Sequence, residues 1–140
     1  MIKFTIYGEP ASKANSRQLV TRGGRPMLIK SKKALDYERT ALFQIPPEAK
    51  QMLVGALIAN ITIYYASERP DLDESIILDV LQAKFETSGL RKICTRKGVY
   101  LNDRQVRERH VYHEIDRANP RAVIEISQRK QAVIFNDEQA

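Results

Sequence analysis

The sequence has little sulfur, little histidine and no long apolar run. Its one cysteine, Cys94, excludes an internal disulfide framework and fits a reducing compartment. Two histidines and this cysteine cannot supply the four ligands of a usual zinc site. The longest apolar stretch, MLVGALIANITIYYA, is interrupted by Asn60 and Thr62 and is too short to span a bilayer. The N-terminal segment lacks the apolar core of a secretion signal, so we expect a cytoplasmic protein without a membrane segment.

The composition indicates one folded domain with an excess of positive charge. Hydrophobic residues make up 43% of the 140 positions and charged residues 29%, which is typical of a globular chain with a core and not of disorder. The 23 Lys and Arg outnumber the 17 Asp and Glu, for a net charge of +6. A basic protein of this size commonly binds a negatively charged partner such as nucleic acid.

The first half of the chain is predicted to contain two strands, a hairpin and a helix. Alternating apolar residues at 2–6 indicate a strand. The basic segment at about 11–33 has a Gly-Gly pair at its middle, which predicts a projecting hairpin arm. A helix is expected at 32–44, before a Pro-Pro pair, and a strand rich in β-branched residues at 57–65.

The second half is predicted to contain one more helix and two more strands. The helix is expected from position 71 to about 86, and the basic connector at 90–98 has no clear form. An Asn-Asp turn at 102–103 precedes an alternating strand, and a last strand is expected at 121–129. The inward residues expected on the first of these strands are Val106, Val111 and Ile115.

This order of elements predicts the fold class. Strand, hairpin, helix, strand, helix and two strands imply an α/β (α+β) domain with a small mixed β-sheet packed by two main helices. The domain covers residues 1–140, with a frayed tail at about 130–140.

Acidic residues gather where the second helix is expected to begin. In RPDLDES, Asp71 can cap the helix and Glu74 can complete a capping box, and both carboxylates suit the positive end of the helix dipole. This interpretation leaves Asp73 unexplained, because three carboxylates within four residues repel one another. Asp79, further along, is expected on the solvent face of the helix.

A metal site is the other interpretation of the same acids. Alternate residues of an extended segment point the same way, so Asp71 and Asp73 can hold one hard cation before the helix begins. A third ligand would have to come from another element, and Asp103 at the predicted turn is the best candidate. The residues alone leave capping and metal binding both open.

The two acidic motifs together resemble those of a known enzyme family. RPDLDES and GVYLNDRQV, preceded by a P-x-S-x-x-N-x-R stretch, resemble in content and order the motifs of the RusA-type Holliday-junction resolvases, which are crossover junction endodeoxyribonucleases. The resemblance covers about residues 4–126. The N-terminal stretch is matched here by Pro10, Ser12, Asn15 and Arg17.

The resemblance implies an enzyme with a metal centre. It implies that Asp71, Asp73 and Asp103 bind a catalytic Mg²⁺, for which Mn²⁺ can substitute. The implied activity is a metal-dependent endodeoxyribonuclease that resolves four-way (Holliday) DNA junctions by paired nicks, in DNA recombination and repair. The implied partners are branched DNA and a second copy in a homodimer, in the cytoplasm of a bacterial or phage-infected cell.

The sequence departs from the family pattern at one position that bears on activity. A Lys that commonly follows the second Asp of D-L-D by one helical turn is replaced by Ile77. Lys13, Lys32 or Lys33 could supply a cation from another element. The alternatives are a catalytically weak or inactive branched-DNA-binding protein of the same fold, and an interaction protein whose acids only cap a helix.

Basic residues near these motifs are candidates for DNA contacts. Phosphate contacts give affinity without reading sequence, and a basic arm can supply several of them. The alternative for any one of these residues is an ordinary solvated surface. The candidates are Lys13, Asn15, Arg17, Arg25, Lys32, Lys33 and Arg104.

Overall fold

A mixed α+β architecture, as expected from the sequence, is seen in the computed structural model, which describes residues 1–12, 15–69 and 73–130. The predictions for Lys13, Asp71 and the tail beyond position 130 lie outside these residues. In chain order the elements are β1 (Ile2–Tyr7), β2 (Arg17–Arg22), β3 (Arg25–Lys30), α1 (Lys32–Gln44), η1 (Pro47–Ala49), β4 (Leu57–Tyr65), α2 (Ser75–Leu81), β5 (Lys84–Ser88), β6 (Arg91–Arg96), η2 (Asp103–Gln105), β7 (Val106–Ile115) and β8 (Arg121–Gln128).

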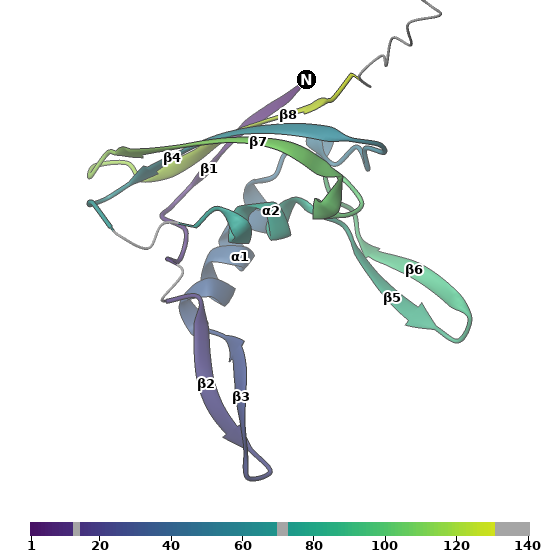
Figure 1. The fold of residues 1–140 in the computed structure, drawn as a ribbon. Helices are drawn as coiled ribbons and strands as arrows, with labels where there is room; N and C mark the ends of the chain where they lie inside the picture. The colour runs from purple at the N-terminus through teal and green to yellow at the C-terminus, as the bar shows by residue number, and fades with distance from the viewer. Residues whose placement is uncertain (13–14, 70–72, 131–140) are drawn as a thin grey trace, which may run out of the picture.

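Four strands form a mixed sheet in the order β1-β8-β4-β7 (Figure 1). β4 pairs in parallel with β7 and antiparallel with β8, so Ile61 lies between Val111 and Ile124. The central position of β4 suits its sequence. Alternate side chains of this strand are apolar, and all of them point to the face that the rest of the fold covers. Those buried side chains are Leu57, Ala59, Ile61, Ile63 and Tyr65.

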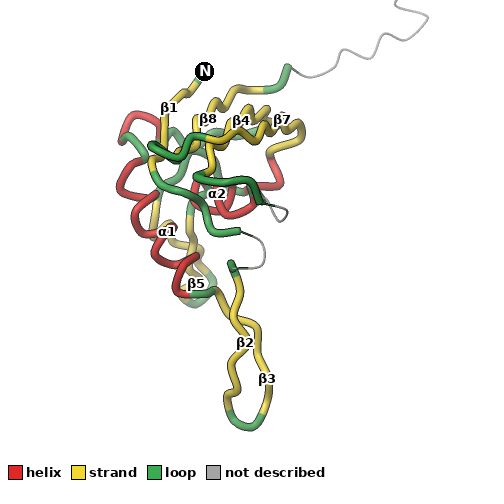
Figure 2. Tube along the Cα trace, turned by 90° about the vertical axis from the view of Figure 1, so that its left-hand side faces the viewer, coloured by secondary structure: helices red, strands yellow, loops and turns green. Residues whose placement is uncertain are grey.

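Both helices cover the same face of this sheet (Figures 1 and 2). α1 begins after Ser31, whose side-chain oxygen accepts a hydrogen bond from the Ala34 N–H at 3.1 Å, and it ends before the Pro-Pro pair. α2 has seven residues, too few to be stable alone, and depends on burying its apolar side chains. None of the helices in the described ranges is long and apolar enough to cross a membrane.

Two hairpins project from the layered body (Figures 1 and 2). β2 and β3 form the predicted arm, and Gly23 and Gly24 turn it with φ angles of 58° and 76°, a backbone region that favours glycine. β5 and β6 form a second hairpin that turns at Gly89, with φ 63°. This second hairpin was not predicted.

The helix expected at 71–86 is wrong in its C-terminal part. α2 ends at Leu81 because Gln82 adopts an extended backbone and forms a bridge to Tyr100. The following residues then pair as β5 with β6. On β7, Val106 is buried and Val111 packs against the core as expected, but the expectation for Ile115 is wrong, since its side chain is 54% exposed at the end of the strand.

The segment 98–100 joins these parts through its backbone. On one side its carbonyls accept hydrogen bonds from residues 52–53, at 3.1 and 2.8 Å. On the other side it pairs with the end of α2, where the Val99 N–H donates to the Leu81 carbonyl at 2.8 Å. A Cβ added at Gly98 would lie 2.4–2.6 Å from backbone atoms of residues 81–83, so only glycine fits this approach.

We expect Gly98→Ala to destabilise the protein by about 2–3 kcal/mol, because the added methyl group must push two backbone segments apart. Urea unfolding followed by circular dichroism measures the change. Lys97→Ala, at an exposed neighbouring position, is the matched control and should change stability by less than about 0.5 kcal/mol. Equal stability of the two variants would contradict the close approach.

Candidate metal and nucleic-acid site

Asp73 lies immediately before α2 and bonds to its first residue. One carboxylate oxygen accepts from the Ser75 N–H at 3.1 Å and the other accepts from the Ser75 hydroxyl at 2.7 Å. The helix begins only at Ser75 and Glu74 is its N-cap, so the predicted capping box, with Asp71 as the cap and Glu74 inside the first turn, is wrong. The proposed cap and metal ligand Asp71 lies outside the described residues. Asp73 therefore carries out part of the capping role that was assigned to its neighbours.

Asp103 is the first residue of η2, at the turn predicted for 102–103. Asn102 caps this short helix through a capping box with Gln105. The Asp103 N–H donates to the side-chain oxygen of Gln82 at 3.0 Å, which ties the turn to the end of α2. The turn is thus fixed to the same helix that Asp73 precedes.

Asp79 is the acidic residue that sequence reasoning missed. It is half-buried on α2, so its expected place on the solvent face is wrong. Burial raises the pKa of the Asp79 carboxyl, the charge of Lys30 opposes this rise, and the negative charge of Asp103 adds to it. The available signal was a single charge within the otherwise apolar run IILDVL.

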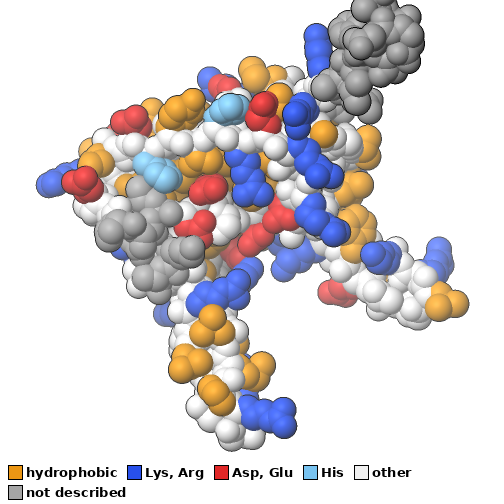
Figure 3. Space-filling model, viewed as in Figure 1, with side chains coloured by type: hydrophobic (Ala, Val, Ile, Leu, Met, Phe, Trp, Pro, Cys, Tyr) orange, Lys and Arg blue, Asp and Glu red, His pale blue; other side chains and the backbone are white. Residues whose placement is uncertain are grey.

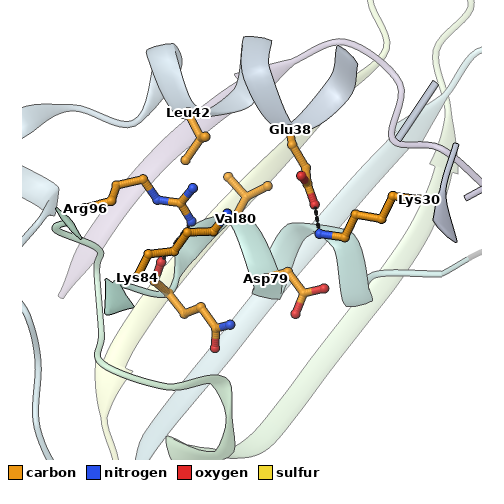
Figure 4. Close-up of a pocket in the computed structure, with 8 residues that line it drawn as sticks. Lys30, Glu38, Leu42, Asp79, Val80, Lys84 and Arg96 are labelled. Atoms are coloured by element: carbon orange, nitrogen blue, oxygen red, sulfur yellow. Dashed lines mark hydrogen bonds and ion pairs between the residues drawn. The ribbon is translucent and has the colours of Figure 1, made fainter. Parts of the chain in front are cut away.

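Asp73 and Asp79 line one cleft of about 430 Å³ between α2 and the base of the β2–β3 arm. Arg17 and Lys30 line the same cleft. Asp79 and Lys30 also line a smaller cavity of about 50 Å³, where Lys30 forms an ion pair with Glu38 (Figure 4). Carboxylates and cations therefore lie together in both cavities, which share Lys30 and Asp79.

The base of the second hairpin closes the smaller cavity. Lys84 and Arg96 line it opposite Lys30, and the Arg96 guanidinium donates to the Gln82 carbonyl at 3.3 Å (Figure 4). In Figure 3, acidic side chains gather between the bases of the two hairpins and are bordered by Lys and Arg. Both arms thus begin at the acidic region.

The predicted DNA-contact residues are distributed over several elements. Arg17 reaches the cleft, whereas Arg25 lies near the turn of the arm. Lys32 and Lys33 are exposed at the start of α1 and do not line the cleft, and Arg104 is exposed beside Asp103. The Asn15 carbonyl accepts a hydrogen bond from the Ser31 hydroxyl, which joins the base of the arm to α1.

Two buried tyrosines, Tyr65 and Tyr100, lie close enough to the acids to be affected by their charge. Burial raises the pKa of Tyr65 to about 12, and nearby carboxylates, Asp73 among them, contribute to the rise. Burial also raises the pKa of Tyr100, whose hydroxyl donates to the Leu78 carbonyl at 2.6 Å, and the charges of Asp103 and Asp79 add to this. These phenols stay neutral at ordinary pH and add no further negative charge to the site.

The donor set is oxygen-only, which suits a hard cation such as Mg²⁺ or Mn²⁺. Within residues 1–12, 15–69 and 73–130, no three His, Cys, Asp or Glu side chains are grouped closely enough to hold a metal ion. The predicted trio includes Asp71, so its convergence is not tested by these residues. No protein-family model matches the chain, and no curated protein sequence matches it.

Gln105 holds the Asp103 turn in place. Its side-chain oxygen accepts from the N–H groups of Leu101 and Asn102, both at 2.9 Å, and its amide donates to the carbonyls of Leu53 and Gly55 at 2.8 and 3.1 Å. One side chain therefore satisfies four backbone groups.

We expect Gln105→Ala to cost about 2–4 kcal/mol of stability, because it leaves several backbone groups without partners. Thermal and urea unfolding provide the measurement. Gln51→Ala is the control, since Gln51 donates one side-chain hydrogen bond, to the Glu48 carbonyl at 3.0 Å. A loss at Gln105 no larger than at Gln51 would show that the turn does not depend on this side chain.

Proposed function

We propose that this protein is a metal-dependent endodeoxyribonuclease that resolves four-way DNA junctions, as its resemblance to the RusA-type resolvases implies. The observation that carries the proposal is a cleft that Asp73 and Asp79 line together with Arg and Lys side chains, with Asp103 close enough to Asp79 to raise its pKa. A basic protein that gathers carboxylates in this way needs a cation there to approach a phosphate backbone. By the resemblance alone, it acts as a homodimer in the cytoplasm of a bacterial or phage-infected cell.

The proposed ligands of Mg²⁺, or of Mn²⁺ in its place, are Asp71, Asp73 and Asp103, with Asp79 beside them. The proximity of the Asp79 and Asp103 charges supports this choice, because a divalent cation would relieve their repulsion. When bound, the cation supplies activation of water and neutralisation of the phosphate charge. Gln82 and Gln105, which hydrogen-bond to the turn, would keep Asp103 in place.

Lys30 is the proposed substitute for the Lys that the family carries at the position of Ile77. Ile77 is fully buried, so a Lys at that position would place its ammonium group in the core. Lys30 approaches Asp79 from β3 and is held by its ion pair with Glu38. The Lys30 ammonium group would contact a phosphate bound in the cleft.

A second candidate function is binding of branched DNA without cleavage. One observation favours it: Ile77 replaces the cation of the family motif. The two arms and the basic surface would serve this function equally well. Cleavage assays therefore separate the two candidates.

We expect Asp103→Asn to reduce cleavage of a synthetic four-way junction by about 100-fold or more in Mg²⁺ or Mn²⁺, because it weakens the proposed metal site. Gel analysis of nicked products measures the rate, and a binding assay in Ca²⁺ should show junction affinity retained. Asp36→Asn, at an exposed position on α1, is the control and should cleave normally. Binding of the junction by the unaltered protein without cleavage in either metal would favour the second candidate.

We expect Lys30→Met to slow cleavage by about 10- to 100-fold, with junction affinity in Ca²⁺ changed much less. Lys3→Met is a matched control, because it removes a comparable Lys–Glu ion pair, with Glu125, at the far strand of the sheet. Urea unfolding of both variants separates a rate effect from lost stability. Equal cleavage rates for the two variants would contradict the assigned role of Lys30.

A further inference from the structure

The tip of the β5–β6 hairpin presents one fully exposed apolar side chain. Ser88 pairs with Arg91, so the loop consists of Gly89 and Leu90 alone. Gly89 has the positive φ that such a tight turn requires. Leu90 is as exposed as a side chain in an extended peptide, at 105%. A two-residue turn leaves little freedom to fold this side chain back onto the hairpin.

The hairpin behind this tip is strongly basic. From position 84 to 97 there are five Lys or Arg residues and one acid, Glu86. Arg91 and Lys92 directly follow the tip and lie opposite Ser88 and Thr87, so no acid neutralises them across the strands. An apolar point flanked by cations matches a polyanion that has an apolar interior, which describes stacked DNA bases between phosphate backbones.

The base of the hairpin is fixed to the acidic region. Arg96 bonds to the Gln82 carbonyl, and the Gln82 side chain accepts from the Asp103 N–H. β5 has five residues, which at about 3.3 Å each extend roughly 16 Å. Stacked bases rise about 3.4 Å each, so the tip stands about five base steps from the acids.

The β2–β3 arm differs in this respect. Its turn consists of Gly23 and Gly24, which have no side chains to insert between bases. Its exposed large apolar residues lie on the side of the arm and not at its end: Leu19 pairs with Leu28, and Met27 lies opposite Val20. The apolar tip is therefore specific to the second hairpin.

We propose that the β5–β6 hairpin is a DNA-binding arm whose tip residue Leu90 inserts into the base stack at a branch point, while Arg91 and Lys92 contact the flanking phosphates. This inference rests on the proposed function, because it assumes that branched DNA occupies the cleft. A branch point is favoured over a duplex because its bases are less completely stacked, so insertion disrupts less stacking. A second copy of the chain is disfavoured as the occupant, since two such hairpins would bring like charges together.

The test uses the full chain in Ca²⁺ with a synthetic four-way junction that carries 2-aminopurine at one branch position. We expect the unaltered protein to raise the 2-aminopurine fluorescence, which reports unstacking. Leu90→Ser should abolish this rise and weaken junction binding about tenfold, while duplex affinity stays the same. Leu90→Phe should retain the rise. Leu19→Ser, which removes an exposed leucine from the side of the other arm, is the control and should behave as the unaltered protein.

The outcomes separate this inference from the proposed function. If the unaltered protein cleaves the junction in Mg²⁺ but Leu90→Ser leaves fluorescence and affinity unchanged, the wedge is overturned and the nuclease proposal stands. If the unaltered protein binds no branched DNA, both are overturned. If sedimentation shows that Leu90→Ser dissociates a dimer, with the fluorescence rise intact at saturating protein, the tip contacts a second copy and the inference is overturned.

Discussion

The structure depends on the backbone pairing of the segment 98–100 with the end of α2. This pairing ends the helix at Leu81 and sets the direction in which the β5–β6 hairpin leaves the body. It also carries the chain directly into the turn that holds Asp103. Because a seven-residue helix has little stability of its own, the position of Asp79 relies on the same contact. One close approach, possible only at Gly98, therefore positions both acids and the second arm.

In the acidic region, the fold holds Asp79 and Asp103 near one another although their negative charges repel. Asp79 and Asp103 meet in a half-buried place, where the loss of solvation and mutual repulsion both disfavour two charges. Backbone donors and packing determine where the acids stand, since Gln82 and Gln105 hold the turn independently of charge. A bound cation, as proposed above, would relieve the repulsion that the fold imposes on these carboxylates. The Lys and Arg side chains around the site would attract an anionic ligand.

The sequence was informative wherever one local signal had one structural meaning. Alternation in β4, the Pro-Pro pair after α1 and the Gly-Gly turn each had a single meaning, and each element formed as predicted. Gly89 was ambiguous, because a helix end and a hairpin turn both use a glycine with positive φ. The residues on either side of it have no clear period, so the helix was extended too far and the second hairpin was missed. Only the pairing with Tyr100, distant in sequence, decides between the two.

The candidate site shows the same limit, because its parts meet through contacts distant in sequence. The acidic motifs placed Asp73 and Asp103 at element boundaries, but nothing local showed that Asp79 would turn towards Asp103. A charge on a short helix is usually solvated, and only the tertiary packing of η2 and β3 against α2 changes that expectation. The proposed pairing of roles between Ile77 and Lys30 was also invisible in the sequence, because Lys30 lies on β3, distant in sequence from α2. A cation near the acids is defined by its position in space, and an adjacent strand can supply it when the helix position is needed for the core.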